Sequence, residues 1–134
     1  MDITKIRNEI RRRVVAAAKI DPATQLQLQN TTFVPKKTFP FWISEHVVGG
    51  QNNAITNQRC GYDAFIIQYD FVCYAGNGVT QIETASGSVS DIISPGDNIT
   101  IDGISADVMN TKISQSGNDK FSSVEFAITL HISD

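Results

Sequence analysis

The sequence predicts an α+β fold, a two-layer sandwich in which a mainly antiparallel sheet carries two helices packed on one face. Residues 2–19 and 79–93 repeat apolar residues at the three- and four-residue spacing of a helix. Several other stretches alternate apolar and polar residues, as half-buried strands do. These strand-like stretches follow one another across short turns, which favours antiparallel pairing. Because an amphipathic helix must bury its apolar stripe, both helices are expected on the apolar face of the sheet.

A length of 134 residues and a hydrophobic content of 41% fit one domain over residues 1–134. Within it we expect a helix over residues 1–20 and a polar, proline-containing connection over residues 21–40. The sheet and the second helix occupy residues 41–134.

The composition excludes several classes of protein. An apolar run such as Val14–Ala18 is too short to span a membrane, and no apolar stretch follows the basic N-terminus as it would in a secretory signal. Cys60 and Cys73 form neither a disulfide framework nor a metal-binding set, so both are expected as reduced thiols.

The first helix is predicted from its apolar stripe. Asp2 is the predicted N-cap, and Asp21-Pro22 ends the helix because a residue before proline disfavours helical backbone. Arg12 points away from the stripe, and three other arginines flank it, with stems that cover apolar surface and guanidinium groups that reach outward. The stripe consists of Ile3, Ile6, Ile10, Val14 and Ala17, and the flanking arginines are Arg7, Arg11 and Arg13.

The middle of the chain is predicted to form two strands. Residues 21–37 are interpreted as an irregular polar connection, and a strand follows over residues 41–48. Residues 49–53 are rich in Gly and Asn and indicate a turn or a flexible loop. Residues 61–74 are the strongest strand candidate. One face of that strand is expected to be apolar and consists of Phe65, Ile67, Tyr69, Phe71 and Cys73.

The remaining elements are a helix and a β-meander. Gly76-Asn77-Gly78 is expected to turn the chain into the helix over residues 79–93, which the interior Gly87 weakens. Asp102-Gly103 predicts a type I′ hairpin turn, and a second turn is expected over residues 116–119. The last strand is predicted from strict alternation, with a core face made of Val124, Phe126, Ile128, Leu130 and Ile132.

No pattern in the sequence indicates catalysis. His46 and His131 each stand alone on predicted polar strand faces, without a metal ligand at a suitable spacing. The acids are spread over turns and strand faces, and no nucleophile elbow, phosphate loop or dinucleotide motif is present. We therefore expect a protein that is not an enzyme and that uses no metal or other cofactor.

The charge is divided unevenly along the chain. Residues 1–37 hold eight Lys and Arg against three Asp and Glu, a net charge of +5, whereas residues 38–134 carry −8. A basic segment on an acidic body attracts either nucleic acid or the acidic body of an identical neighbour. Aromatic residues are not interleaved with the cations, as a nucleic-acid stacking surface requires. This favours a solvated or subunit-facing helix edge, and a small nucleic-acid-binding module remains the alternative.

Several short motifs between Asn30 and Gly78 resemble one family. The motifs are Phe33-x-Pro35, Phe39-Pro40-Phe41-Trp42-Ile43, Gly49-Gly50, Arg59-Cys60-Gly61 and Gly76-Asn77-Gly78. With the leading helix and the final hairpin, they resemble the small tail terminator and terminator-like proteins of tailed bacteriophages. The resemblance implies a structural virion protein of the tail or neck, assembled in the host cytoplasm as a ring, usually six-fold. Such a ring caps the tail tube and stops its polymerisation.

The resemblance also implies partners and an interface. The partners are other copies of the chain, the tail tube protein and a head-completion or neck protein, while DNA passes through the lumen without specific binding and no membrane is involved. A ring requires two different complementary patches on each copy, and the +5 leading segment and the −8 body provide them. The polar loop from Gly49 to Gln58 is expected to become ordered on the tube or on the neighbouring copy. The candidate interface residues are Arg7, Arg11, Arg12, Arg13, Gly49, Gly50, Gln51, Asn52, Asn53 and Arg59.

Overall fold

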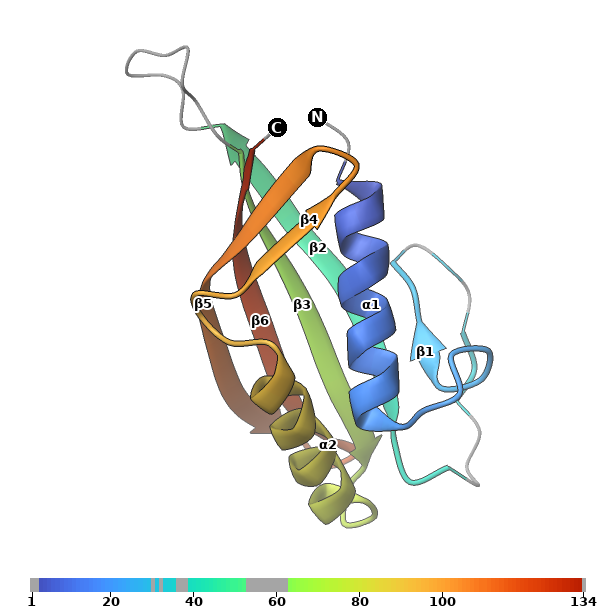
Figure 1. Cartoon of the computed structure of the whole chain (residues 1–134). Helices are drawn as coiled ribbons and strands as arrows, with labels where there is room; N and C mark the ends of the chain where they lie inside the picture. Colours follow the sequence, from blue (N-terminus) through green and yellow to red (C-terminus); the bar gives the residue numbers. More distant parts are fainter. Residues whose placement is uncertain (1–2, 30, 32, 36–38, 53–62, 134) are drawn as a thin grey trace.

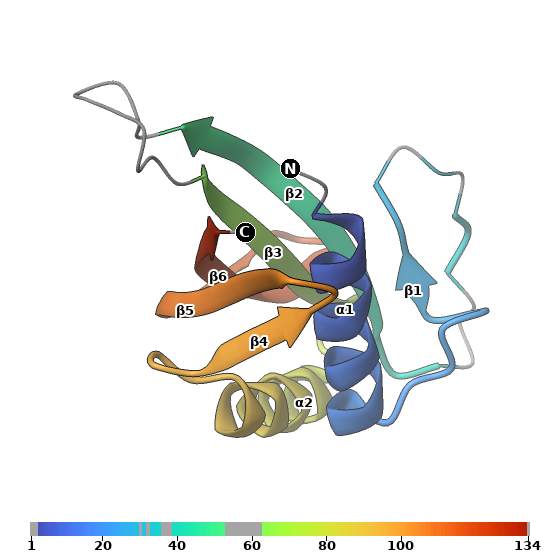
Figure 2. The ribbon, with the colours of Figure 1, turned by 45° about the horizontal axis from the view of Figure 1, so that its top comes forward.

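One curled six-stranded sheet and two helices make up the computed structural model, which describes residues 3–29, 31, 33–35, 39–52 and 63–133 (Figure 1). In chain order the elements are α1 (Thr4–Ala18), β1 (Leu26–Gln27), β2 (Trp42–Asn52), β3 (Asp63–Tyr74), α2 (Val79–Ile92), β4 (Asn98–Ile101), β5 (Ile104–Gly117) and β6 (Phe121–Ser133). The strand order is β1-β2-β3-β6-β5-β4. Both helices lie inside the curve of the sheet, and β4 comes forward beside α1 (Figure 2). No helix in the described ranges is long and apolar enough to cross a membrane.

The α+β class is confirmed, whereas the two-layer antiparallel description is only partly right. Four strand pairings are antiparallel, but β1 pairs with β2 in parallel, so the sheet is mixed. The sheet also curls around the helices as part of a barrel instead of lying flat beneath them (Figure 2). The strands β5 and β6 are long, and a right-handed twist accumulates along them. The pairing of β5 with β6 also shifts its register between Val108 and Asn110, so the ladder is irregular at this point.

The connection predicted over residues 21–40 contains a strand that periodicity does not reveal. The strand β1 has only two residues, which is too short to show an alternation of apolar and polar residues. Leu26 nevertheless pairs with Ile43 at the edge of the sheet. The side chain of Gln25 fixes this segment, because its Nε2 donates to the carbonyl of Phe41 over 3.1 Å. Further along, the N–H of Val47 donates to Oε1 of Gln29 over 3.0 Å. The connection thus covers part of the outer edge of β2.

The core lies between the helices and the inner face of the sheet. From α1, Ile6, Ile10 and Val14 are fully buried, as the predicted stripe requires. Ala18 completes the buried stripe, and Ala17 is only partly buried. The predicted inner faces of β3 and β6 are also correct, since they bury Ile67, Tyr69, Phe71, Cys73, Val124, Phe126, Ile128, Leu130 and Ile132.

The ends of the helices differ slightly from the sequence prediction. The N-cap of α1 is Ile3, without a side-chain cap, while the predicted cap Asp2 lies outside the described residues. Lys19 adopts left-handed backbone at the C-terminus (φ 57°) and its N–H donates to the carbonyl of Val15. The predicted hairpin turn is confirmed, because Asp102 and Gly103 both have positive φ, as a type I′ turn requires.

Candidate interaction surface

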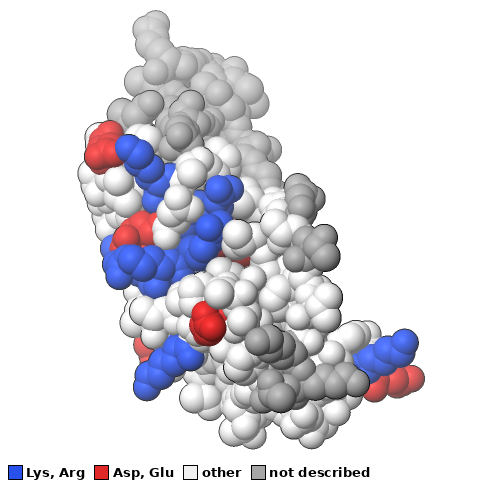
Figure 3. All heavy atoms as spheres, turned by 90° about the vertical axis from the view of Figure 1, so that its right-hand side faces the viewer, with Lys and Arg blue, Asp and Glu red and all other residues white. Residues whose placement is uncertain are grey.

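The arginines of α1 lie on the side of the molecule that carries α1 and β1, where blue side chains gather in Figure 3. Three of them, Arg11, Arg12 and Arg13, bind carboxylates of the same chain. The sequence predicts that these guanidinium groups bind acids of a neighbouring copy. It does not predict the ion pairs that they form within one copy. The intramolecular pairs divide the arginines into Arg11, which binds a buried carboxylate on β2, and Arg12 and Arg13, which share a carboxylate of α1 itself.

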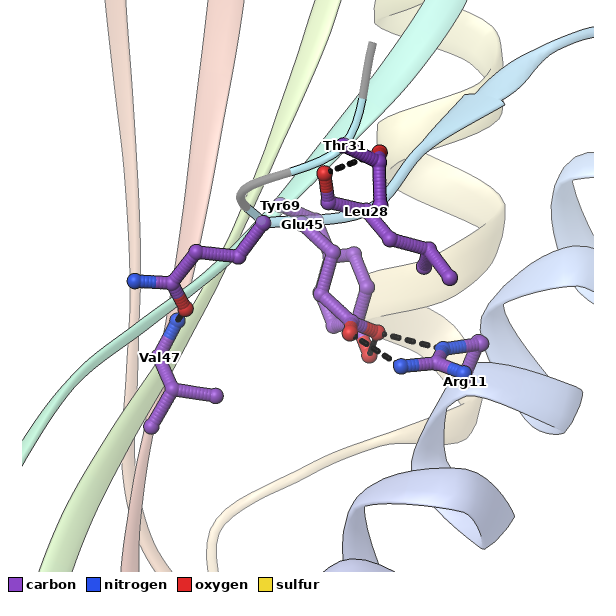
Figure 4. Close-up of polar contacts among 7 residues, drawn as sticks. Arg11, Leu28, Thr31, Glu45, Val47 and Tyr69 are labelled. Carbon is purple, nitrogen blue, oxygen red and sulfur yellow. Dashed lines mark hydrogen bonds and ion pairs between the residues drawn. The ribbon is translucent and has the colours of Figure 1, made fainter.

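Arg11 belongs to a buried network that joins α1 to the sheet (Figure 4). Its Nε and Nη2 donate to the two carboxylate oxygens of Glu45, over 2.9 and 2.5 Å. The hydroxyl of Tyr69 donates to the same carboxylate over 2.8 Å. The Glu45 side chain is only 3% exposed, so these three bonds replace the water that a carboxylate ordinarily requires.

The network shifts the proton equilibria of its members. Burial is the main cause that raises the pKa of Tyr69 well above its ordinary value, and the charge of Glu45 adds to it. The hydrogen bonds to Glu45 raise the pKa of Arg11. Both side chains therefore stay protonated at neutral pH, and the network acts as a fixed structural link.

Arg7 is another half-buried cation of α1. Its Nε atom is buried and has no hydrogen-bond partner among the described residues. The positive charge of Arg7 also acts on Tyr69, where it opposes the rise in that pKa. Arg7 therefore adds positive charge next to the buried network without a carboxylate of its own in the described part of the chain.

Arg12, which is exposed, and Arg13, which is partly buried, share one carboxylate of α1. Nε and Nη2 of Arg12 lie 3.0 and 2.7 Å from Glu9, and Nε of Arg13 lies 2.8 Å from it. Two guanidinium groups on one carboxylate leave one positive charge in excess. The same hydrogen bonds, first from Arg12 and then from Arg13, lower the pKa of Glu9 from 4.5 to about 2.

The lowered pKa of Glu9 predicts an acid-dependent contribution to stability. Between pH 4.5 and about 2 the unfolded chain binds a proton at this site that the folded chain does not, so stability rises with pH over this range. We expect Glu9→Gln to lower the free energy of unfolding at neutral pH, and the difference from the wild type to vanish as the pH falls through 2. Urea unfolding at a series of pH values measures this, and a difference that stays constant over that range would contradict it.

Four of the other predicted interface residues lie at the far end of β2. Gly49, Gly50, Gln51 and Asn52 continue this strand, so the prediction of a loop that begins at Gly49 is wrong for these four. The strand continues because a register shift between Val47 and Gly50 accommodates the glycines while pairing with β3 is kept to Asn52 and Asp63. Asn53 and Arg59 lie outside the described residues.

His46 has a partner that the sequence does not indicate. Nε2 of His46 on β2 lies 3.3 Å from a carboxylate oxygen of Asp70 on β3, so the prediction that His46 stands alone is wrong. The pair is two residues off direct register, a diagonal cross-strand contact. The described residues contain no group of three His, Cys, Asp or Glu that could hold a metal ion.

Two of the motif segments that carry the family resemblance meet at one end of the sheet. A Cβ atom on Gly78 would lie 2.2 Å from the carbonyl oxygen of Pro40, so the turn into α2 packs directly against the segment before β2. Trp42 packs edge-on against Tyr74 and Phe121, with ring centroids 5.4 and 6.0 Å apart. The two segments are therefore in direct contact, and the space at Gly78 leaves no room for a Cβ atom.

These features define a small α+β protein in which arginines gather on one helix, α1. Several solved structures share the fold, and two of them do so over almost the whole chain. One, a protein whose name carries no functional description, is 18% identical with a TM-score of 0.72 and covers 100% of this chain and 97% of its own. The other comes from the virion of a native gene transfer agent (GTA) particle, is 10% identical with a TM-score of 0.54, and covers 93% and 92%. No protein-family model and no curated protein sequence matches the chain.

Proposed function

We propose that this chain is a structural protein of a phage-like virion, and within that class a tail terminator. As a ring it would cap the tail tube, stop its polymerisation and join it to the head-completion proteins. The observation that carries the virion role is the fold shared with a chain of the GTA virion along nearly the full length of both. The finer assignment rests on the motif resemblance and on the contact between the Pro40 and Gly78 segments.

The distribution of charge supports self-assembly. The chain carries +5 in its first 37 residues and −8 in the rest, and α1 retains positive charge after its own ion pairs are formed. Copies of such a molecule attract one another through unlike patches, which is the geometry of a ring. The proposal assigns the protein no catalytic role and no cofactor.

The alternative function, nucleic-acid binding by the basic helix, receives less support. Aromatic residues are not interleaved with the cations, as a nucleic-acid stacking surface requires, and Arg11 is held by the buried Glu45, so it is not available to displace counterions from a phosphate. Weak association with DNA would still be compatible with a lumen through which DNA passes.

Assembly of the purified protein tests the proposal. We expect light scattering over a concentration series to give oligomers that end at one defined size, and negative-stain microscopy to show annular particles. Added to polymerising tail tube protein, the chain is expected to shorten the tubes. A strictly monomeric protein that leaves tube length unchanged, and that binds DNA with steep salt dependence, would contradict it in favour of the alternative.

A further inference from the structure

The outward side of α1 carries a shallow hollow with a cationic rim and an apolar floor. Its volume is about 390 Å³, and it is lined by Asn8, Arg11, Arg12, Val15, Ala16 and Pro22. The Arg12 side chain at its rim is 68% exposed and shares the Glu9 carboxylate with Arg13. Because this leaves positive charge in excess beside an apolar floor, the hollow suits an occupant that is acidic and presents little side-chain bulk.

The same chain contains a sequence stretch of opposite charge. Between Arg59 and Lys112 the sequence has no Lys or Arg and seven Asp or Glu. Two of these acids, Glu83 and Asp91, are exposed on α2. They are eight residues apart, about 12 Å along the helix axis. Their carboxylates can therefore reach a cation placed between them.

Gly87 lies midway between these acids, four residues from each, and the fold of a single copy does not explain it. Its backbone does not have positive φ, and a Cβ atom built on it would meet nothing within 4 Å. Glycine in the interior of a helix is less favourable than alanine. A helix surface without a side chain at this position allows another surface to approach the backbone closely.

We propose that the acidic face of α2, made of Glu83, Gly87 and Asp91, docks into the α1 hollow of a second copy. This inference rests on the proposed self-assembly and names the two surfaces that would meet. Arg12 then lies between the two carboxylates, while the backbone at Gly87 approaches the floor at Ala16. The two patches differ, so the contact is head-to-tail, and repeated contacts close into a ring when the rotation permits.

Charge reversal tests the contact. In sedimentation velocity, Arg12→Glu and Asp91→Arg are each expected to weaken self-association by roughly tenfold or more in Kd. The double variant Arg12→Glu/Asp91→Arg is expected to regain assembly, because the reversed charges attract again. Lys112→Glu and Asp119→Arg change exposed charges on β5 and in the following turn, outside both surfaces, and serve as matched controls that should assemble like the wild type.

Gly87→Ala provides a test that an unfolded variant cannot imitate. We expect its melting temperature to rise by a few degrees, because alanine favours the helix and its Cβ meets no atom of the same copy. We expect its self-association to weaken, because the same Cβ then stands between the two copies. Stability and assembly thus change in opposite directions.

The outcomes separate this inference from the proposed function. If the wild type forms rings and the single charge variants do so equally well, the α1–α2 contact is wrong and ring assembly stands. The same conclusion follows if the double variant is folded and fails to recover, or if Gly87→Ala assembles as well as the wild type. A wild-type chain that stays monomeric at every soluble concentration would overturn both.

Discussion

Replacing Arg11 by methionine is expected to lower the free energy of unfolding by about 3–5 kcal/mol. The substitution keeps the aliphatic stem and removes the guanidinium group that holds both oxygens of Glu45. Glu45 then remains buried, with a side chain only 3% exposed, and of these contacts retains only the Tyr69 hydroxyl. Leaving such a carboxylate without its partner costs more than the pair itself contributes.

Arg13→Met is the matched control, because Arg13 also lies on α1 and also binds a carboxylate. Its partner Glu9 keeps Arg12, and its own side chain is 33% exposed. We expect a loss below about 1 kcal/mol for this variant, as for a surface ion pair. Urea unfolding of both variants measures the difference, and equal losses would contradict a structural role for the buried network.

A compensated variant separates the charge from the packing. In Arg11→Met/Glu45→Met/Tyr69→Phe the three polar partners are removed together, so no buried charge is left unpaired. Replacing a buried ion pair by apolar groups of similar size is often neutral or stabilising. We expect this triple variant to recover most of the stability that Arg11→Met loses. A triple variant as unstable as Arg11→Met would indicate that the loss comes from repacking beneath α1.

The sequence contains a local signal for the network, but not its partner. Glu45 occupies the register of the apolar face of β2, between Ile43 and Val47, and an acid in such a position predicts a buried pair. Periodicity correctly places Arg11 beside the apolar stripe of α1. That the two meet depends on how α1 lies across β2, 34 residues further along the chain. Local patterns carry no information on that crossing.

The elements themselves were predictable because each is encoded by its own residues. The stripe of α1, the inner faces of β3 and β6 and the turn at Asp102-Gly103 follow from spacing and backbone preference alone. The short strand β1 and the continuation of β2 through Gly49 depend instead on hydrogen bonds to neighbouring strands. The residues of these two segments do not by themselves predict a strand. The predicted interface is likewise a property of two copies, and it stays a prediction.

Gly78→Ala is expected to destabilise the fold by about 3 kcal/mol or more. Gly78 has φ of +113°, a conformation that residues with a Cβ rarely adopt, and it caps the N-terminus of α2. A Cβ there would lie 2.2 Å from the carbonyl oxygen of Pro40 and 3.1 Å from Cβ of Cys73. The first contact is with backbone that leads directly into β2, so relief requires movement of the segment before that strand.

Gly76→Ala in the same turn isolates the steric part of this effect. Gly76 also has positive φ, +76°, but nothing lies within 4 Å of its Cβ position. It should lose only the conformational part, about 1 kcal/mol. Thermal unfolding of the two variants, followed by circular dichroism and by Trp42 fluorescence, measures the difference. Because Trp42 lies two residues after Pro40 and packs on Tyr74, Gly78→Ala should also change its emission before unfolding. Equal melting temperatures for the two variants would mean that the turn into α2 does not press on the Pro40 segment.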